Sequence, residues 1–241
     1  MKVKILIGLV ITVSCLTANL KAQNKMNINQ ALTAKQQVIV PIAAYTAKGK
    51  LQELKSAIND GLNAGLTINE IKEVIVHLYA YCGFPRSIRG LQTFMEVLDE
   101  RKAKGVNDVL GVEASSIQNE RPKYERGKSI LEKLTGTPQD APVKGYSAFA
   151  PEIDVFLKEH LFADIFERDV LTYSERELVT VSVLSSIGGV EPMLRTHLNI
   201  CLNAGLTKEQ LQQFVLIIKS TIGGEEAKDA QDVLNEVLKN R

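Results

Sequence analysis

The sequence has no tryptophan and few aromatic residues of any kind, which make up 5% of its 241 residues. An excess of one charge is also missing, because 29 Lys and Arg face 28 Asp and Glu and no basic run stands out. Proteins that bind nucleic acid usually carry a basic stripe or patch. The composition therefore argues against a nucleic-acid partner.

Strand-like patterns are absent as well. No stretch alternates between apolar and polar residues over the length of a half-buried strand, whereas apolar residues recur at helical spacing along much of the chain. This pattern predicts an all-α fold.

The apolar run near the amino terminus, from Ile5 to Val13, is too short to span a membrane and remain as an anchor. Two lysines precede it and small and polar residues follow, which is the layout of a signal peptide with a cut after Ala22. We expect residues 1–22 to be removed and the protein to be periplasmic or secreted, with no stable membrane span.

Cleavage just before Cys15 would instead produce a lipoprotein. The three preceding residues, Thr12 to Ser14, match the usual leucine-containing lipobox poorly. Soluble export is therefore the favoured alternative.

One six-residue stretch occurs twice without change, as Leu62–Thr67 and Leu202–Thr207. Moving the sequence by this spacing of 140 residues aligns residues 32–98 with 172–238 without a gap. A match of this length indicates two tandem copies of one structural unit. We expect a first unit at 30–102, a linker with short helices at 103–151 and a second unit at 152–241.

The repeated stretch also predicts how each unit is built. Gly65 suits the left-handed end of one helix, and Thr67 with Glu70 forms a capping box that starts the next helix. Thr207 and Gln210 do the same in the second copy. Each copy should therefore contain a helix, a glycine stop and a capped helix.

Other helix boundaries follow from the same signals. Pro41 lies within a helical pattern at 32–46 and should start, kink or break that helix. Ser174, with Glu177 three residues later, predicts a capped start for the first helix of the second copy. An aromatic-rich helix is expected at 152–166.

Two cysteines remain after the expected cleavage, Cys82 and Cys201. In an oxidising compartment they could form one disulfide. They occupy non-equivalent positions in the two copies, and nothing in the sequence pairs them. Two separate buried thiols are the favoured interpretation.

The two copies carry a family resemblance. The run Glu70–Pro85, and the run Tyr173–Val179 that leads through Arg195–Leu198 to Asn203–Thr207, resemble the carboxymuconolactone decarboxylase family of the alkylhydroperoxidase-like superfamily. The resemblance covers both copies and much of the linker. It implies a tandem helical protein that acts on a small molecule. Because the family commonly builds rings, it also implies a homo-oligomer such as a trimer of two-copy chains.

The family includes a peroxidase branch that uses a Cys-x-x-Cys pair followed by a histidine. His197 occupies the histidine position, but Val190 and Met193 occupy the two cysteine positions. The first copy also lacks this pair. Dithiol peroxidase chemistry needs a reactive thiolate and a resolving thiol within reach. The resemblance therefore favours the decarboxylase branch over the peroxidase branch.

One group of candidate site residues lies in the first copy. Glu73, His77 and Tyr81 follow one another at four-residue spacing and share one helix face, and Glu70 lies one turn earlier. Such a ladder can hold an imidazole in one tautomer and keep it basic near neutral pH. We take Glu73, His77 and Tyr81 as catalytic candidates and Glu70 as a substrate-binding candidate. The alternative is a solvated polar face with an ordinary ion pair.

The second group consists of His197, Arg195 and Arg176. His197 is a catalytic candidate through its family position, and the two arginines are candidates for binding the substrate. Taken alone, Arg176 favours a surface ion pair. Because the polar residues of the two copies complement each other, we expect one composite pocket in which His77 and His197 lie close together.

Loss of CO2 from an unsaturated lactone acid needs a cation, a general acid or base, and a donor to the carbonyl oxygen. The candidate residues can supply all three, so the sequence favours a carboxy-lyase or isomerase that acts on a small lactone or carboxylic acid. A peroxidase with Cys201 as a lone thiol activated by His197, and a non-catalytic protein that binds a small molecule, remain alternatives. Export argues against the namesake step of aromatic catabolism.

Metal binding has little support in the sequence. The chain has three histidines, and no two of them have the spacing of metal ligands. Glu73 with His77 would need two further donors from elsewhere. We therefore expect no metal site and no cofactor.

Overall fold

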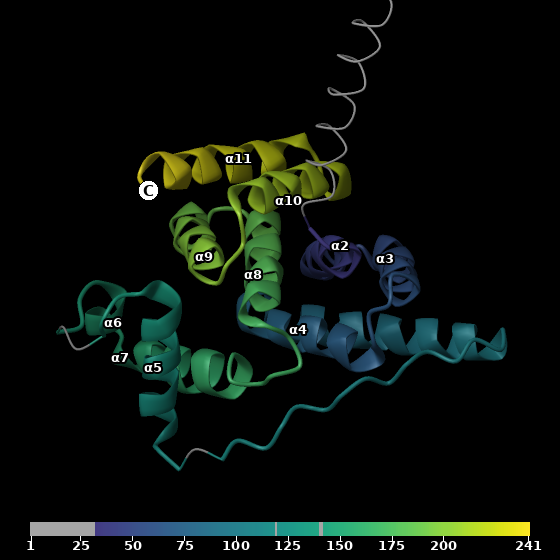
Figure 1. The fold of residues 1–241 in the computed structure, drawn as a ribbon, viewed down its shortest axis with the longest axis horizontal. Coiled ribbons are helices and arrows are strands. Elements are labelled where there is room, and N and C mark those ends of the chain that lie inside the picture. Colours follow the sequence, from purple (N-terminus) through teal and green to yellow (C-terminus); the bar gives the residue numbers. More distant parts are fainter. Residues whose placement is uncertain (1–31, 119, 140–141) are drawn as a thin grey trace, which may run out of the picture.

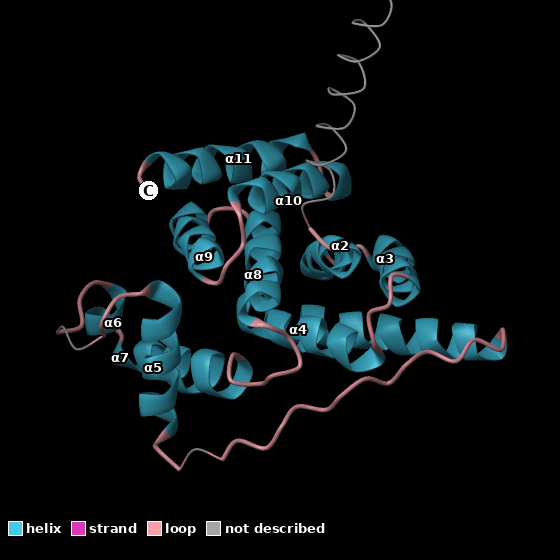
Figure 2. Ribbon diagram, viewed as in Figure 1, coloured by secondary structure: helices cyan, strands magenta, loops and turns pink. Residues whose placement is uncertain are grey.

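The computed structural model describes residues 32–118, 120–139 and 142–241, and the secondary structure in these ranges is helical (Figure 2). The predicted all-α class is therefore confirmed. The expected signal peptide and the alternative lipidation at Cys15 lie outside the described residues. No helix within the described ranges is both long enough and apolar enough to cross a membrane.

The two copies form matching sets of helices. The first set is α2 (Ala34–Lys48), α3 (Leu51–Asn63) and α4 (Ile68–Ala103). The second set is α8 (Tyr173–Ile187), α9 (Glu191–Asn203), α10 (Lys208–Thr221) and α11 (Gly224–Lys239). Helix α4 corresponds to both α10 and α11, because it breaks at Gly83, where φ is 80° and ψ is 161°. Gly223, at the equivalent place between α10 and α11, also has a positive φ, of 135°.

The predicted gapless register is wrong for the first helix of each copy. Thr33 caps α2 and Thr172 caps α8, which is a spacing of 139 residues rather than 140. From the second helix of each copy onward the spacing is 140 residues. The extra residue lies in the loop after α8, where Gly188 and Gly189 both have positive φ.

Ser174 does not cap α8, contrary to the prediction. The hydroxyl of Thr172 accepts a hydrogen bond from the backbone N–H of Glu175 at 3.3 Å, and the carboxylate of Glu175 accepts one from the backbone N–H of Thr172 at 2.8 Å. This pair completes the capping box. Glu177 is thereby left for another partner. The predicted capping boxes at the starts of α4 and α10 are confirmed.

Both units contribute to one core. Helix α2 packs against α8 near the centre of the molecule, α4 packs against α8, and α10 packs against α2 (Figure 1). One hydrophobic cluster contains buried side chains from all seven helices of the two sets. The apolar faces of the two units are therefore buried against each other.

Helix α2 neither starts nor ends at Pro41, although a proline is expected to disrupt a helix at such a position. A proline in a helix interior removes one backbone hydrogen bond. Its neighbours Ile39, Val40, Ile42 and Ala43 are completely buried in the core. Tertiary packing on both sides of the proline therefore holds the helix together.

The connection between the two units begins with an extended strap that runs beside α4 (Figure 1). The carbonyl groups of Val109 and Leu110 accept hydrogen bonds from the first backbone N–H groups of α4, at Ile68 and Asn69. Four short elements follow the strap: α5 (Lys123–Thr135), α6 (Tyr146–Phe149), α7 (Pro151–Phe156) and the π-helix η1 (Leu157–Ile165).

The single helix expected at 152–166 is instead divided into the short helix α7 and the π-helix η1. The π-helix packs so closely against α5 that a Cβ atom on Gly127 would lie 1.7 Å from the carbonyl oxygen of Lys158. Wide helical turns of this kind are rare and often occur at functional sites. Side chains of α5, η1 and α9, among them Leu134, Phe162 and Ile200, form a second hydrophobic cluster. This cluster places α5 and η1 over one face of α9.

Candidate active site

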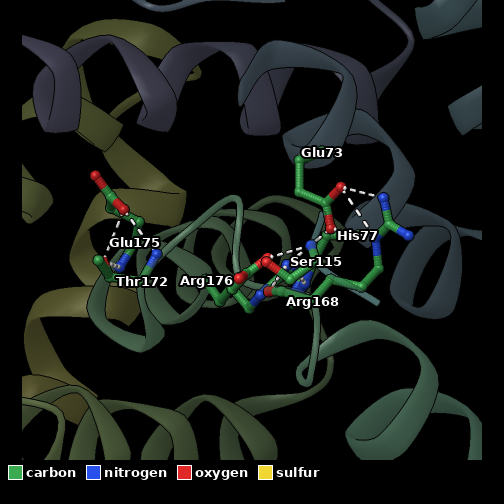
Figure 3. Close-up of polar contacts among 8 residues, drawn as sticks. Glu73, His77, Ser115, Arg168, Thr172, Glu175 and Arg176 are labelled. Atoms are coloured by element: carbon green, nitrogen blue, oxygen red, sulfur yellow. Dashed lines mark hydrogen bonds and ion pairs between the residues drawn. The ribbon is translucent and has the colours of Figure 1, made fainter. Parts of the chain in front are cut away.

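A buried ion-pair network joins α4 to α8 and to the segment before α8 (Figure 3). The carboxylate of Glu73 accepts hydrogen bonds from Arg168 at 2.8 and 3.0 Å and from Arg176 at 2.7 Å. Burial alone would raise the pKa of Glu73, but the hydrogen bonds and charges of the two arginines outweigh burial and lower it. Glu73 is therefore a paired carboxylate that links the two units.

Arg176 is completely buried, so the surface ion pair favoured by the sequence is wrong. Its guanidinium also donates a hydrogen bond to the carbonyl oxygen of Arg168. A buried charge is tolerated only when it is paired and hydrogen-bonded, and Glu73 supplies the paired charge. Arg176 is thus held by groups of the protein itself, and Figure 3 shows it beside Arg168 and His77.

His77 has both ring nitrogens engaged. Nη1 of Arg176 lies 3.4 Å from Nδ1, and Oγ1 of Thr180 lies 2.9 Å from Nε2. Because a guanidinium can only donate, Nδ1 accepts and Nε2 carries the proton that is donated to Thr180. Burial, together with the charges of Arg176 and His197, lowers the pKa of His77 well below its ordinary value. The prediction that a ladder with Glu73 keeps His77 basic near neutral pH is therefore wrong.

Tyr81 lies between the two histidines that the sequence singles out. Its ring stacks on His77 with the centroids 5.4 Å apart, and it meets His197 edge-on with the centroids 6.0 Å apart. Oγ1 of Thr180 lies 3.2 Å from the phenol oxygen and donates its own proton to the carbonyl oxygen of Arg176 at 3.0 Å, so the phenol can donate to Thr180. Burial and the charge of Glu177 raise the pKa of Tyr81, so the phenol stays protonated. The structure thus brings His77 from the first unit and His197 from the second to one cluster around Tyr81.

Glu177 is the partner of His197. Nδ1 of His197 lies 2.8 Å from Oε2 of Glu177, whose side chain is completely buried. Because a carboxylate accepts, Nδ1 carries a proton, and in the neutral form of the ring Nε2 carries the lone pair. Among the described residues Nε2 has no hydrogen-bond partner, and the imidazole is 12% exposed. This arrangement leaves one basic nitrogen available to a bound molecule.

The sequence prediction gave Glu177 only a capping role and missed this pair. The burial of α8 could have indicated that Glu177 has a partner inside the protein. Residues 176–186 of α8 are all buried, because helices of both units surround it. A charged residue in such a helix must find a partner inside the protein.

His197 lines a pocket of about 430 Å³ between α5, η1 and α9. Most of its wall is apolar, and the apolar side chains include Leu131, Leu157, Leu161, Phe162, Pro192 and Ile200. Thr196, Gln139 and Tyr146 add polar groups, and Met193 lies at one of the family's cysteine positions. A pocket of this size with one basic group fits a small organic molecule.

The internal repeat relates the site around His197 to an equivalent place elsewhere in the chain. There the ionisable groups are replaced by uncharged residues. The equivalents of Glu73, His77, Tyr81 and His197 are Gln213, Ile217, Thr221 and Ala57, and those of Arg176 and Glu177 are Gln37 and Val38.

Two of these replacements have taken a structural role. Gln213 accepts a hydrogen bond from the backbone N–H of Leu32 at 2.6 Å, and Gln37 donates one to the carbonyl oxygen of Leu32 at 2.8 Å. Of the two related sites, only the one around His197 keeps the chemistry of acid–base catalysis.

None of the three predicted substrate-binding residues lines the pocket, and two of them also lie away from the buried cluster around Tyr81. Glu70 completes the capping box of α4 and pairs with Lys35. Arg195 is exposed and pairs with Glu236 of α11. The structure therefore brings together Glu73, His77, Tyr81, Arg176 and His197, and it leaves out Glu70 and Arg195. Of the five clustered residues only His197 lines the pocket, so the predicted composite pocket with polar groups from both units is wrong.

Neither cysteine has the features of a reactive thiol. Cys82 and Cys201 are both free, and burial raises the pKa of Cys82 to about 11. Burial and the charge of Glu177 raise the pKa of Cys201 well above its ordinary value, so the neighbouring pair does not activate it. Within the described ranges no group of three or more His, Cys, Asp or Glu side chains is arranged to hold a metal ion.

Both units of the chain match a known protein family. The model of the carboxymuconolactone decarboxylase family matches residues 16–94 and 151–236, on the two sides of the connection. The 4-carboxymuconolactone decarboxylase of Acinetobacter baylyi (strain ATCC 33305 / BD413 / ADP1) is 26% identical over 123 residues. This match covers 51% of the chain and 91% of the relative, so the relative is about half as long as this two-copy chain.

Proposed function

The chain belongs to the carboxymuconolactone decarboxylase family, and on this premise we propose that it is an acid–base lyase or isomerase acting on a small lactone or carboxylic acid. His197 is the group that moves the proton, and Glu177 holds its ring. One site per chain, the pocket that His197 lines, carries the reaction.

The observation that supports this proposal is the way His197 is held. Its Nδ1 is bound to a buried carboxylate, while Nε2 has no partner among the described residues and the ring lines the pocket. A carboxylate behind an imidazole fixes its tautomer and stabilises the imidazolium that forms when Nε2 takes a proton. His77 cannot do this work, because both of its nitrogens are engaged inside the protein.

The reaction of an unsaturated lactone acid can be written with these groups. The bond between the ring carbon and the carboxylate breaks, CO2 leaves, and the electron pair moves through the double bond onto the lactone carbonyl oxygen. The imidazolium of His197 then delivers a proton to carbon, and the neutral imidazole regains a proton from water. In an isomerisation the same nitrogen first removes a proton from one carbon and then returns it to another.

The alternative of a thiol peroxidase has less support. Val190 and Met193 stand where that branch has its cysteines, and both available thiols have raised pKa values. A non-catalytic binding protein would not need a buried carboxylate behind the pocket histidine. The complete set of ionisable groups at one site, beside its loss at the related site, also favours catalysis.

The experiment is a turnover assay on the protein without its predicted signal peptide. Unsaturated lactone acids with one carboxylate, and 4-carboxymuconolactone for comparison, are followed by CO2 release and by proton NMR, with a peroxide-reduction assay on the same preparation. We expect turnover that is lost in His197→Ala and kept in Arg195→Ala, whose exposed side chain lies on the same helix. Turnover that survives His197→Ala places the site elsewhere, and peroxide reduction lost in Cys201→Ser supports the thiol alternative.

Export and oligomer formation remain predictions of the sequence. If the amino-terminal segment directs export, the substrate is one that is present outside the cytoplasm. Appearance of the protein in a periplasmic or secreted fraction, with Gln23 as its first residue, tests this directly. Sedimentation of the purified protein tests the expected trimer.

A further inference from the structure

The pocket beside His197 holds no fixed positive charge. Its wall is apolar over most of its area, and apart from His197 its polar groups are the uncharged side chains of Gln139, Tyr146 and Thr196. Among the described residues that line it there is no lysine, arginine, aspartate or glutamate. A ligand therefore meets at most one cation there, which is protonated His197.

The buried cations among the described residues, Lys158 and Arg176, are committed to other partners. Lys158 donates hydrogen bonds to Asp154 at 2.7 Å and to the phenol oxygen of Tyr124 at 2.9 Å. Arg176 is completely buried and paired with Glu73. Neither lines the pocket. Releasing Arg176 would remove one of the two arginines that pair with buried Glu73, and releasing Lys158 would leave Asp154 without its ion-pair partner.

A carboxylate that leaves water needs a charged or hydrogen-bonding partner in the protein. One carboxylate can pair with the imidazolium of His197, or a lactone carbonyl can accept a hydrogen bond from it. A second carboxylate on the same molecule would find no second cation, only the apolar wall and the uncharged side chains of Gln139, Tyr146 and Thr196. Hydrogen bonds from uncharged donors would compensate only part of its lost hydration.

We infer that this pocket accepts an apolar acid or lactone with no more than one negative charge and rejects compounds with two carboxylates. The inference rests on the proposed function and names its substrate class. It separates this chain from a role on 4-carboxymuconolactone, which carries two carboxylates.

The test compares the binding of two acids of similar size, 4-ethylbenzoate with one carboxylate and terephthalate with two. Both are titrated into the purified protein and followed by calorimetry and by the ring resonances of His197. We expect 4-ethylbenzoate to bind at least tenfold more tightly than terephthalate and to lose affinity in His197→Ala. Equal or tighter binding of terephthalate overturns the inference, as does failure of both acids to bind.

A charge-addition variant gives a second measurement. Met193 is about half exposed at the pocket, so Met193→Arg adds a cation at its rim without entering the core. This variant should bind terephthalate at least tenfold more tightly than the unaltered protein does. Leu216→Arg is the matched control, because Leu216 is equally exposed on α10 and does not line the pocket. An equal gain in both variants would mean that the site of binding is not this pocket.

The binding test and the turnover assay can contradict the two proposals independently. If 4-ethylbenzoate is preferred but no acid or lactone is converted, the assignment of the pocket stands and the proposed catalysis is wrong. If lactone acids are converted but terephthalate is not discriminated against, catalysis stands and the substrate class is wrong.

Discussion

Nδ1 of His197 lies 2.8 Å from Oε2 of Glu177, and this hydrogen bond joins a pocket-lining helix to the buried helix behind it. Glu177 lies on α8 and His197 on α9. The second carboxylate oxygen of Glu177 has no hydrogen-bond partner in the described part of the chain. A buried carboxylate oxygen without a hydrogen-bond partner lowers the stability of the folded protein. Such a cost is typical of a group that serves catalysis rather than folding.

The first prediction concerns the two members of this pair. His197→Ala should lower kcat by about 10² to 10⁴-fold, which is the usual contribution of a positioned general acid or base. Glu177→Gln keeps an acceptor for Nδ1 but removes the charge that stabilises the imidazolium, so it should lower kcat by a smaller factor with little change in KM. Steady-state kinetics on the best acid or lactone checks both values.

The control for this prediction is Arg195→Ala, which removes an exposed charge from α9 without touching the pocket. Its kcat should match that of the unaltered protein. A Glu177→Gln variant with unchanged kcat would show that the carboxylate plays no part in catalysis.

The second prediction concerns the stability that the buried ion pair provides. Glu73→Gln leaves Arg176 buried without its charge partner, and breaking a buried pair in this way costs about 3–5 kcal/mol. The matched variant Glu236→Gln breaks the exposed pair with Arg195 and should cost about 0–1 kcal/mol. Urea unfolding followed by circular dichroism measures both. Similar losses in the two variants would contradict the role given to Glu73.

The same pair predicts the response to acid. The pKa of Glu73 is lower in the folded protein than its ordinary value of 4.5, so below that value the unfolded chain binds the proton more readily. The stability contributed by Glu73 is therefore complete above about pH 4.5 and is lost as pH falls through the folded pKa. Glu73→Gln should show a weaker dependence of unfolding free energy on pH in this acid range.

The third prediction concerns His77. Its pKa in the folded protein lies well below the ordinary value of 6.5, so below pH 6.5 the unfolded chain binds a proton that the folded chain does not. Stability should therefore fall as pH decreases from this value. His77→Gln keeps a donor and an acceptor but cannot titrate, and it should reduce this slope. Urea unfolding at a series of pH values measures it, and an unchanged slope would mean that His77 is not buried in its neutral form.

The fourth prediction concerns the two thiols. The pKa of Cys82 is about 11 and that of Cys201 is raised well above 9.0, so both are protonated at mildly alkaline pH. Iodoacetamide should label Cys82 slowly and Cys201 not at all in the folded protein, and both should react quickly in urea. Peptide mass spectrometry measures the labelling. Rapid labelling of Cys201 in the folded protein would support the peroxidase alternative instead.

Much of the fold could be predicted because its signals are local. The glycine stop and the threonine cap with its partner three residues later define the starts of α4 and α10 wherever they occur. The predicted register of α2 against α8 is wrong by one residue because of a loop rather than a local helix signal. The extra residue beside Gly188 and Gly189 lies in a loop, and the match of the later helices was strong enough to hide it.

The candidate site could be predicted only in part. Helical spacing placed Glu73, His77 and Tyr81 on one face, but it could not show that Glu73 would bind Arg168, which lies in the irregular segment between η1 and α8. Glu177 was missed because two overlapping capping boxes are possible at the start of α8. Tertiary packing determines which of the two capping boxes forms, and no local sequence pattern predicts such packing.

The measurement that tests the account most directly is nitrogen-15 NMR of the three histidine rings. At mildly alkaline pH, His197 should carry its proton on Nδ1 and a lone pair on Nε2, and Glu177→Gln should weaken that preference. His77 should show the opposite tautomer in both proteins, because Arg176 occupies its Nδ1. If His197 of the unaltered protein carries its proton on Nε2, the nitrogen left to the pocket cannot accept a proton, and the proposed role of the pair is wrong.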